Sequence, residues 1–172
     1  MSSPVPAPQY FPEATSVQVV SLESLQDSVL RQARDYWRMV RGTRKFPARE
    51  DIKPRDISMA LNHMVLARIV DRGADLELKI VGDEVSRAYG APMNGRRISE
   101  IAQQLPKAAE RWKQIQRLVA DTRTPIAMSV TVGLDAPEVN YTHAEVVCFP
   151  LGPSDNVVDH LLVFGRHDMR IV

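Results

Sequence analysis

The stretch LELKIVGDEVSRAYGAPMNGRRISEI, residues 76–101, decides which fold this chain is expected to adopt. Its first part alternates in character: Leu76, Leu78 and Ile80 point to one side, and the polar residues between them point to the other. A half-buried strand requires this period of two. The alternation ends at Gly82, so we predict a strand over residues 76–81 with one apolar face.

Two short helices are predicted in the second half of the same stretch. Asp83 is a good N-cap residue, and Gly90 is typical of a helix C-terminus. Between them, an apolar face at turn spacing is formed by Val85, Ala88 and Tyr89. After a polar Gly-containing loop, Ile98 and Ile101 repeat at helical spacing, which indicates one further turn of helix.

The flanking sequence predicts four more strands and one longer helix. Residues 64–70 read as a strand that turns at 71–73 into the strand over 76–81. Residues 105–121 show the apolar spacing of an amphipathic helix. Strands follow over residues 125–134, 139–149 and 157–165. Hairpins at both ends with helices between them indicate an α+β fold, a five-stranded antiparallel sheet with helices on one face.

An N-terminal amphipathic helix is predicted ahead of this sheet. It spans residues 21–42, with Ser21 or Ser24 as N-cap and Gly42 after its last turn. Its apolar stripe needs a partner, either the chain's own sheet or the same helix of a second subunit. The stripe consists of Leu22, Leu25, Val29, Ala33, Tyr36 and Val40. Residues 1–20 are expected to be a flexible Pro-rich arm, in which 17–20 either pair as an edge strand or lead into the helix.

The chain resembles the PAS domain family, and more narrowly a group of short, stand-alone bacterial PAS proteins. The resemblance covers roughly residues 33 to 166. The residues that carry it are Trp37, Arg41, Gly42, Pro47, Arg49, Asp51, Ile52, Pro54, Ile57 and Leu61, followed by Ile80, Val81, Gly82, Tyr89, Gly90, Asn94, Gly95, Arg96, Ile98 and Glu100. It implies a PAS-like domain over residues 43–172, a homodimer formed through the N-terminal helix, and a signalling partner reached in trans.

Composition places the chain among ordinary single-domain proteins. With 172 residues, 44% apolar and 25% charged, it can build one core. A net charge of +1 gives no electrostatic case for nucleic acid. No apolar run is long enough to span a membrane, and the N-terminus lacks the pattern of a secretory signal. The single cysteine excludes an intrachain disulfide and suits the cytoplasm.

No catalytic or metal-binding motif is present in the sequence. The four histidines lack metal-ligand spacing, and the helix over 105–121 carries no histidine that could ligate haem, so no cofactor or metal is expected. Ser129 and Thr131 lie in a predicted strand, without a nucleophile elbow or a histidine placed for a triad. Cys148 is expected to be buried and inert. We therefore do not expect an enzyme.

The interior between sheet and helices is the remaining candidate site. A PAS cavity recognises ligands by apolar walls with a few polar points, and Tyr89 and Trp112 would supply polar tips. The expected walls are Leu78, Ile80, Val85, Tyr89, Ile98, Ile101, Trp112, Ile115, Met128, Val130, Val146 and Cys148. The ligand would be a small apolar or amphipathic metabolite.

Other interpretations remain open. The same residues would line a filled core, which would make the protein an interaction adaptor, and a small α+β enzyme is a further alternative. A basic ridge, defined as Arg31, Arg34, Arg38 and Arg41, either binds an anion or acidic partner or is a solvated helix face.

Overall fold

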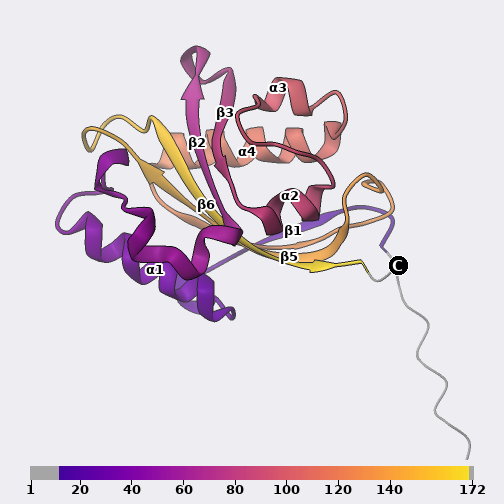
Figure 1. Cartoon of the computed structure of the whole chain (residues 1–172), viewed down its shortest axis with the longest axis horizontal. Coiled ribbons are helices and arrows are strands. Elements are labelled where there is room, and N and C mark those ends of the chain that lie inside the picture. The colour runs from indigo at the N-terminus through magenta and orange to yellow at the C-terminus, as the bar shows by residue number, and fades with distance from the viewer. Residues whose placement is uncertain (1–11, 171–172) are drawn as a thin grey trace, which may run out of the picture.

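The fold is a six-stranded antiparallel sheet with helices on both faces (Figure 1). The structure is a computed structural model, which describes residues 12–170. In sheet order the strands are β1 (Ser16–Val20), β4 (Ile126–Thr131), β5 (Tyr141–Leu151), β6 (His160–Met169), β2 (Met64–Val70) and β3 (Asp75–Val81). The helices are α1 (Ser28–Arg41), α2 (Asp83–Tyr89), α3 (Ile98–Ile101) and α4 (Pro106–Thr122), and Pro54–His63 forms 3₁₀ turns.

The five predicted strands are confirmed, and a sixth is added at the edge. Residues 16–20, within the expected flexible arm, pair with β4 as β1, with Val17 opposite Val130. The edge-strand alternative is therefore confirmed and the lead-in alternative is wrong. The rest of the expected arm falls largely on residues 1–11, which lie outside the described residues.

Helix α1 begins later than predicted. Its N-cap is Asp27, whose Oδ1 accepts hydrogen bonds from the backbone N–H groups of Val29 (2.9 Å) and Leu30 (3.2 Å). Of the predicted caps, Ser21 precedes only a single 3₁₀ turn, Leu22–Ser24, and Ser24 is the last residue of that turn. The Glu145 carboxylate of β5 accepts from the backbone N–H groups of Gln26 and Asp27, both at 2.9 Å. Because these two N–H groups donate to Glu145, they cannot donate to the carbonyls of Leu22 and Glu23, and a helix that continues from residue 22 is excluded.

Each face of the sheet carries its own hydrophobic core: the helices predicted to share one face do so, and the separately predicted N-terminal helix packs on the other. Helices α2, α3 and α4 cover the side that we call the cavity face, defined by Val65, Ala67, Val146 and Cys148. Helix α1 and the 3₁₀ turns cover the other side, the helix face, defined by Met64, Leu66, Val147 and Phe149. Figure 1 shows the sheet running between the two groups of helices. Alternate residues of β2 and β5 are buried on opposite sides, as period-two geometry dictates.

A β-bulge changes the facing of one residue in the stretch that decides the fold. Leu66 pairs with Ile80, but the next residue, Ala67, pairs with Leu78, so Lys79 is the extra residue. Leu76 and Leu78 lie on the cavity face as predicted, whereas Ile80 packs on the helix face. The predicted common face of these three residues is wrong at Ile80, because a bulge shifts the alternation by one position.

The turn after β3 depends on a glycine. A Cβ on Gly82 would lie 2.4 Å from backbone atoms of Asn62, so only glycine permits this approach of the two segments. Gly82 itself occupies the N-cap position of α2, and Asp83 is its first residue rather than its cap. Gly90 ends the helix in the left-handed conformation (φ 67°), as predicted.

Candidate functional site

A cavity of about 60 Å³ lies between the cavity face of the sheet and the helices α2 and α4. Eight of the twelve residues predicted as ligand-binding walls line it. They are Val85, Tyr89, Trp112, Ile115, Met128, Val130, Val146 and Cys148. The sequence pattern therefore locates most of the cavity wall, while ligand binding by these residues stays a prediction.

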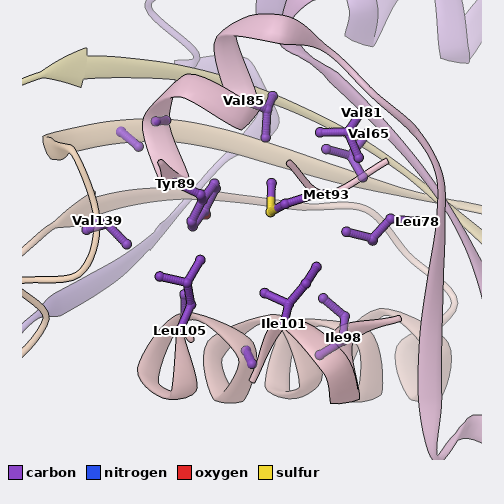
Figure 2. Close-up of a cluster of buried hydrophobic side chains, with 14 of the residues drawn as sticks. Val65, Leu78, Val81, Val85, Tyr89, Met93, Ile98, Ile101, Leu105 and Val139 are labelled. Carbon is purple, nitrogen blue, oxygen red and sulfur yellow. The ribbon is translucent and has the colours of Figure 1, made fainter. Parts of the chain in front are cut away.

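The other four predicted wall residues lie elsewhere. Leu78, Ile98 and Ile101 are buried in the filled part of the same core, around Met93. Figure 2 shows Ile98 and Ile101 pointing from the helical segment towards Leu78 and Met93. Ile80 packs on the opposite face of the sheet, for the reason given above.

Aromatic side chains form one corner of the cavity. The Tyr89 hydroxyl accepts a hydrogen bond from Trp112 Nε1 (3.1 Å) and from the Tyr141 hydroxyl (3.4 Å). The Tyr89 ring meets the rings of Trp112, Tyr141 and His167 edge-on, with centroids 5.5–5.9 Å apart. Burial raises the pKa of Tyr89 well above its usual value, so its hydroxyl stays protonated.

His63 lines the cavity with one nitrogen that has no partner. Its Nε2 lies 2.8 Å from Nη1 of Arg166. A guanidinium only donates hydrogen bonds, so Nε2 must accept, and a neutral His63 then carries its proton on Nδ1. Desolvation, and next the charge of Arg166, lower the pKa of His63, which favours the neutral ring. Its Nδ1 is buried and has no hydrogen-bond partner among residues 12–170.

Two more cavity-lining side chains have a buried nitrogen without a hydrogen-bond partner among the described residues. Within the described part of the chain, His167 Nδ1 and Arg111 Nη2 have no hydrogen-bond partner. The His167 ring lies against Gly165, where a Cβ would come within 2.7 Å of His167 Cε1. Burial lowers the pKa of His167 to about 4, so the ring is neutral at physiological pH. The residues that line this mainly apolar cavity thus include three that each carry a buried nitrogen without a partner among residues 12–170.

A polar chain connects this cavity to the start of α1 on the other face. Arg166 bonds His63 Nε2 with Nη1, and its Nε lies 3.0 Å from Oδ2 of Asp27. The second oxygen of Asp27 caps α1. Two residue-to-residue contacts therefore connect a cavity-lining histidine to the helix cap.

Cys148 is fully buried in the cavity wall, as predicted. Burial raises the pKa of its thiol to about 12. A thiol of this pKa is not a nucleophile at neutral pH, because the thiolate is the reactive form.

A serine, a histidine and an aspartate meet on the exposed end of the helix face, although no histidine was predicted to be placed for a triad with Ser129. Ser129 Oγ lies 2.9 Å from His143 Nε2, and His143 Nδ1 lies 3.6 Å from Asp168 Oδ2. The second distance exceeds a hydrogen bond, and the Asp168 side chain is 78% exposed. Ser129 lies within a strand that is paired on both sides, so the backbone N–H groups around it are committed to the sheet instead of an oxyanion hole.

The predicted dimer stripe packs within the chain itself. Leu25, Ala33 and Tyr36 are buried in the helix-face core, and the remaining three members are partly buried against it, namely Leu22, Val29 and Val40. Of the two partners considered for this stripe, the structure shows the chain's own sheet. A homodimer through these residues would need α1 to leave the sheet, so we do not propose this interface further.

The basic ridge is largely occupied by local contacts. Arg34 donates to the Leu22 carbonyl (2.9 Å) and pairs with Asp35, and Arg38 pairs with Glu23. The Arg41 guanidinium lies over the Trp37 ring, 5.2 Å from its centroid. Three of the four arginines are therefore held by local contacts, which disfavours an anion site, and Arg34 is only 12% exposed.

Sequence reasoning missed the three cavity residues that carry unpartnered nitrogens. Arg111 lies between Ala108 and Ile115 at helical spacing, a signal that could have placed it on the inner side of α4. His167 lies beyond the predicted end of its strand, but β6 continues to Met169. His63 immediately precedes β2, and its facing follows only from the pairing of β2 with β6.

Comparison with known protein families identifies a family for this chain. The sequence model of the PAS domain family matches residues 25–164. No curated protein matches the chain. Within residues 12–170, no helix is long and apolar enough to cross a membrane, and no group of three or more His, Cys, Asp or Glu side chains is arranged to hold a metal ion.

Proposed function

The chain belongs to the PAS domain family, a family of sensory and interaction modules, and from this premise we propose that it senses a small molecule in the cavity behind the sheet. The observation that carries this proposal is the combination of an apolar space and buried, unpartnered polar atoms in its wall. Sites for small molecules have this composition, mostly apolar with a few convergent polar groups. A core evolved only for packing is expected to pair such atoms.

The cavity size limits what such a ligand can be. At about 60 Å³ it is small beside the roughly 300–1,000 Å³ of typical ligand pockets. It accommodates a molecule of a few heavy atoms, or the inner end of a longer one. The small volume also favours the rival function, an interaction adaptor with a nearly filled core.

Transmission to the other face would follow the polar chain from His63 through Arg166 to Asp27. A ligand atom bonded to His63 Nδ1 favours the tautomer in which Nε2 accepts from Arg166. Arg166 in turn holds the carboxylate that caps α1. By this route an occupied cavity biases how α1 packs, and the bias cannot exceed the ligand's difference in affinity for the two packings. A partner protein in the cytoplasm would read the position of α1 in trans.

Native mass spectrometry of freshly purified protein tests the sensing function against the adaptor function. We expect a mass above that of the chain, which disappears after unfolding and refolding in clean buffer. Val146→Phe should fill the cavity and abolish the extra mass. Val147→Phe is unsuitable as a control, because Val147 is fully buried on the helix face. The exposed substitution Met39→Phe is the matched control and should retain it. A chain that never carries extra mass, with a cavity-filled variant more stable than the wild type, would favour the adaptor.

A further inference from the structure

On the premise that the cavity binds a ligand as proposed above, we infer that this ligand is a small aliphatic carboxylate. Neither the family match nor the fold specifies a ligand. The inference comes from the kind of polar atom that the cavity wall leaves unpartnered.

The unpartnered atoms of the wall are nitrogens, and two of them must be donors. Arg111 Nη2 belongs to a guanidinium, which has no acceptor, and His63 Nδ1 carries the ring proton because Nε2 accepts from Arg166. His167 Nδ1 is free to be either donor or acceptor, according to its tautomer. Among the described residues that line the cavity, no oxygen atom is both buried and unpartnered. A ligand that pairs with these donors must therefore supply hydrogen-bond acceptors.

The positive charge of Arg111 narrows the chemical class of the ligand further. Arg111 carries a permanent positive charge and forms no ion pair with any carboxylate of residues 12–170. A carboxylate supplies only acceptors, and its bond to a guanidinium is charge-assisted. An alcohol would accept hydrogen bonds from these donors, but it would not neutralise the positive charge of Arg111. An ammonium group would bring more donors and a charge of the same sign.

The remaining wall selects an aliphatic body for the ligand. Met128, Ile115, Val146 and Cys148 supply apolar surface inside the cavity. A second hollow of about 150 Å³ lies between β1 and α4 and shares Val17, Arg111, Ile115 and Met128 with the cavity. Its other lining residues are mainly apolar, among them Val19 and Leu118. A short alkyl chain can therefore extend past Arg111 into this hollow, which relieves the limit set by the small inner volume.

Three probes with the same six-carbon chain separate these contributions. Sodium hexanoate, 1-hexanol and hexylammonium chloride would be titrated calorimetrically into the refolded, full-length chain. We expect hexanoate to bind about tenfold more tightly than hexanol, the effect of one charge-assisted hydrogen bond. Hexylammonium should bind more weakly than either.

Two arginine variants assign the preference to the cavity. Arg111→Gln should remove most of the tenfold preference for hexanoate and leave the affinity for hexanol within about twofold. Arg117→Gln, an exposed position on the same helix, is the control for a general loss of positive charge and should leave the preference unchanged. Both positions reach solvent, so folding should survive and can be verified by thermal unfolding.

The outcomes separate failure of this inference from failure of the proposed function. Equal binding of hexanoate and hexanol, or an Arg111→Gln variant that keeps the preference, would overturn the carboxylate while leaving a ligand-binding cavity. No binding by any probe, together with native mass spectra free of extra mass, would overturn both.

Discussion

The two faces of the sheet are formed by the same strands, but the core on one face is filled and the core on the other face contains a cavity. On the helix face, the Trp37 ring stacks on Phe149 with centroids 5.1 Å apart, and its Nε1 donates to the Pro150 carbonyl (3.2 Å). On the cavity face, the side chains leave a space of about 60 Å³ and three unpartnered nitrogens. Adjacent residues of β5, Val146 and Val147, thus face opposite environments.

This difference shows how a small domain divides its tasks. A filled core contributes stability, whereas an unfilled space in a core costs stability and is expected where a ligand acts. The helix face would accordingly anchor the fold, and the cavity face would respond to a ligand. Asp27, Arg166 and His63 connect the two.

The largest expected effect is on the helix face. Trp37→Ala should lower the free energy of unfolding by about 3–5 kcal/mol, because it removes a fully buried ring together with its hydrogen bond. Urea unfolding followed by circular dichroism measures this loss. Met39→Ala, on the same helix but 70% exposed, should change the stability by less than about 0.5 kcal/mol. A loss below about 1 kcal/mol for Trp37→Ala would mean that α1 does not pack on the sheet in solution.

The second effect concerns the connection between the faces. Asp27→Ala should cost about 1–2 kcal/mol, because it removes both the cap of α1 and the ion pair with Arg166. Asp27→Asn keeps a good cap and loses only the charge, so its cost should be about 0.5 kcal/mol. Chemical denaturation of both variants provides the test. Equal losses for the two would contradict the capping role.

A smaller effect is expected from the pH dependence of the cavity face. Burial lowers the pKa of His167 from 6.5 to about 4, so between these values the unfolded chain binds a proton that the folded chain does not. The free energy of unfolding should therefore fall as the pH drops from about 6.5 to about 4, by roughly 1–2 kcal/mol after allowance for the partial exposure of this side chain.

Substitution assigns this pH dependence to its source. His167→Phe should flatten part of the slope between pH 6.5 and 4 in thermal unfolding, and the lowered pKa of His63 contributes in the same direction. His160→Phe is the comparison variant. If the His160 substitution flattened the slope and the His167 substitution did not, the assignment to the cavity would be wrong.

Much of the fold could be predicted from sequence, because period-two and helical spacings are local signals. The strand over Met64–Val70 and the turn at Ile98–Ile101 have the predicted bounds. Features that depend on which residues pair between elements were not predictable in the same way. The bulge that turns Ile80 to the helix face is set by the register of β3 against β2, and the start of α1 is set by Glu145 of β5.

The cavity was predictable in its apolar walls but not in its polar atoms. Val146 and Cys148 follow from strand alternation, which is visible in the sequence. The unpartnered state of Arg111, His63 and His167 is a property of three-dimensional neighbours, and no spacing in the sequence encodes it. The approach of Ser129 to His143 is likewise a cross-strand contact, which depends on the register of β4 against β5.

The most direct test of the central contrast is the same added methyl group on either side of β5. Val146→Ile places the methyl at the cavity, and Val147→Ile places it in the filled helix-face core, where Val147 has no exposed surface. In urea unfolding of the refolded proteins, Val146→Ile should leave the free energy of unfolding within about 0.5 kcal/mol of the wild type, and Val147→Ile should lower it by about 1–3 kcal/mol. Equal losses for the two variants would contradict the presence of an unfilled space on the cavity face alone.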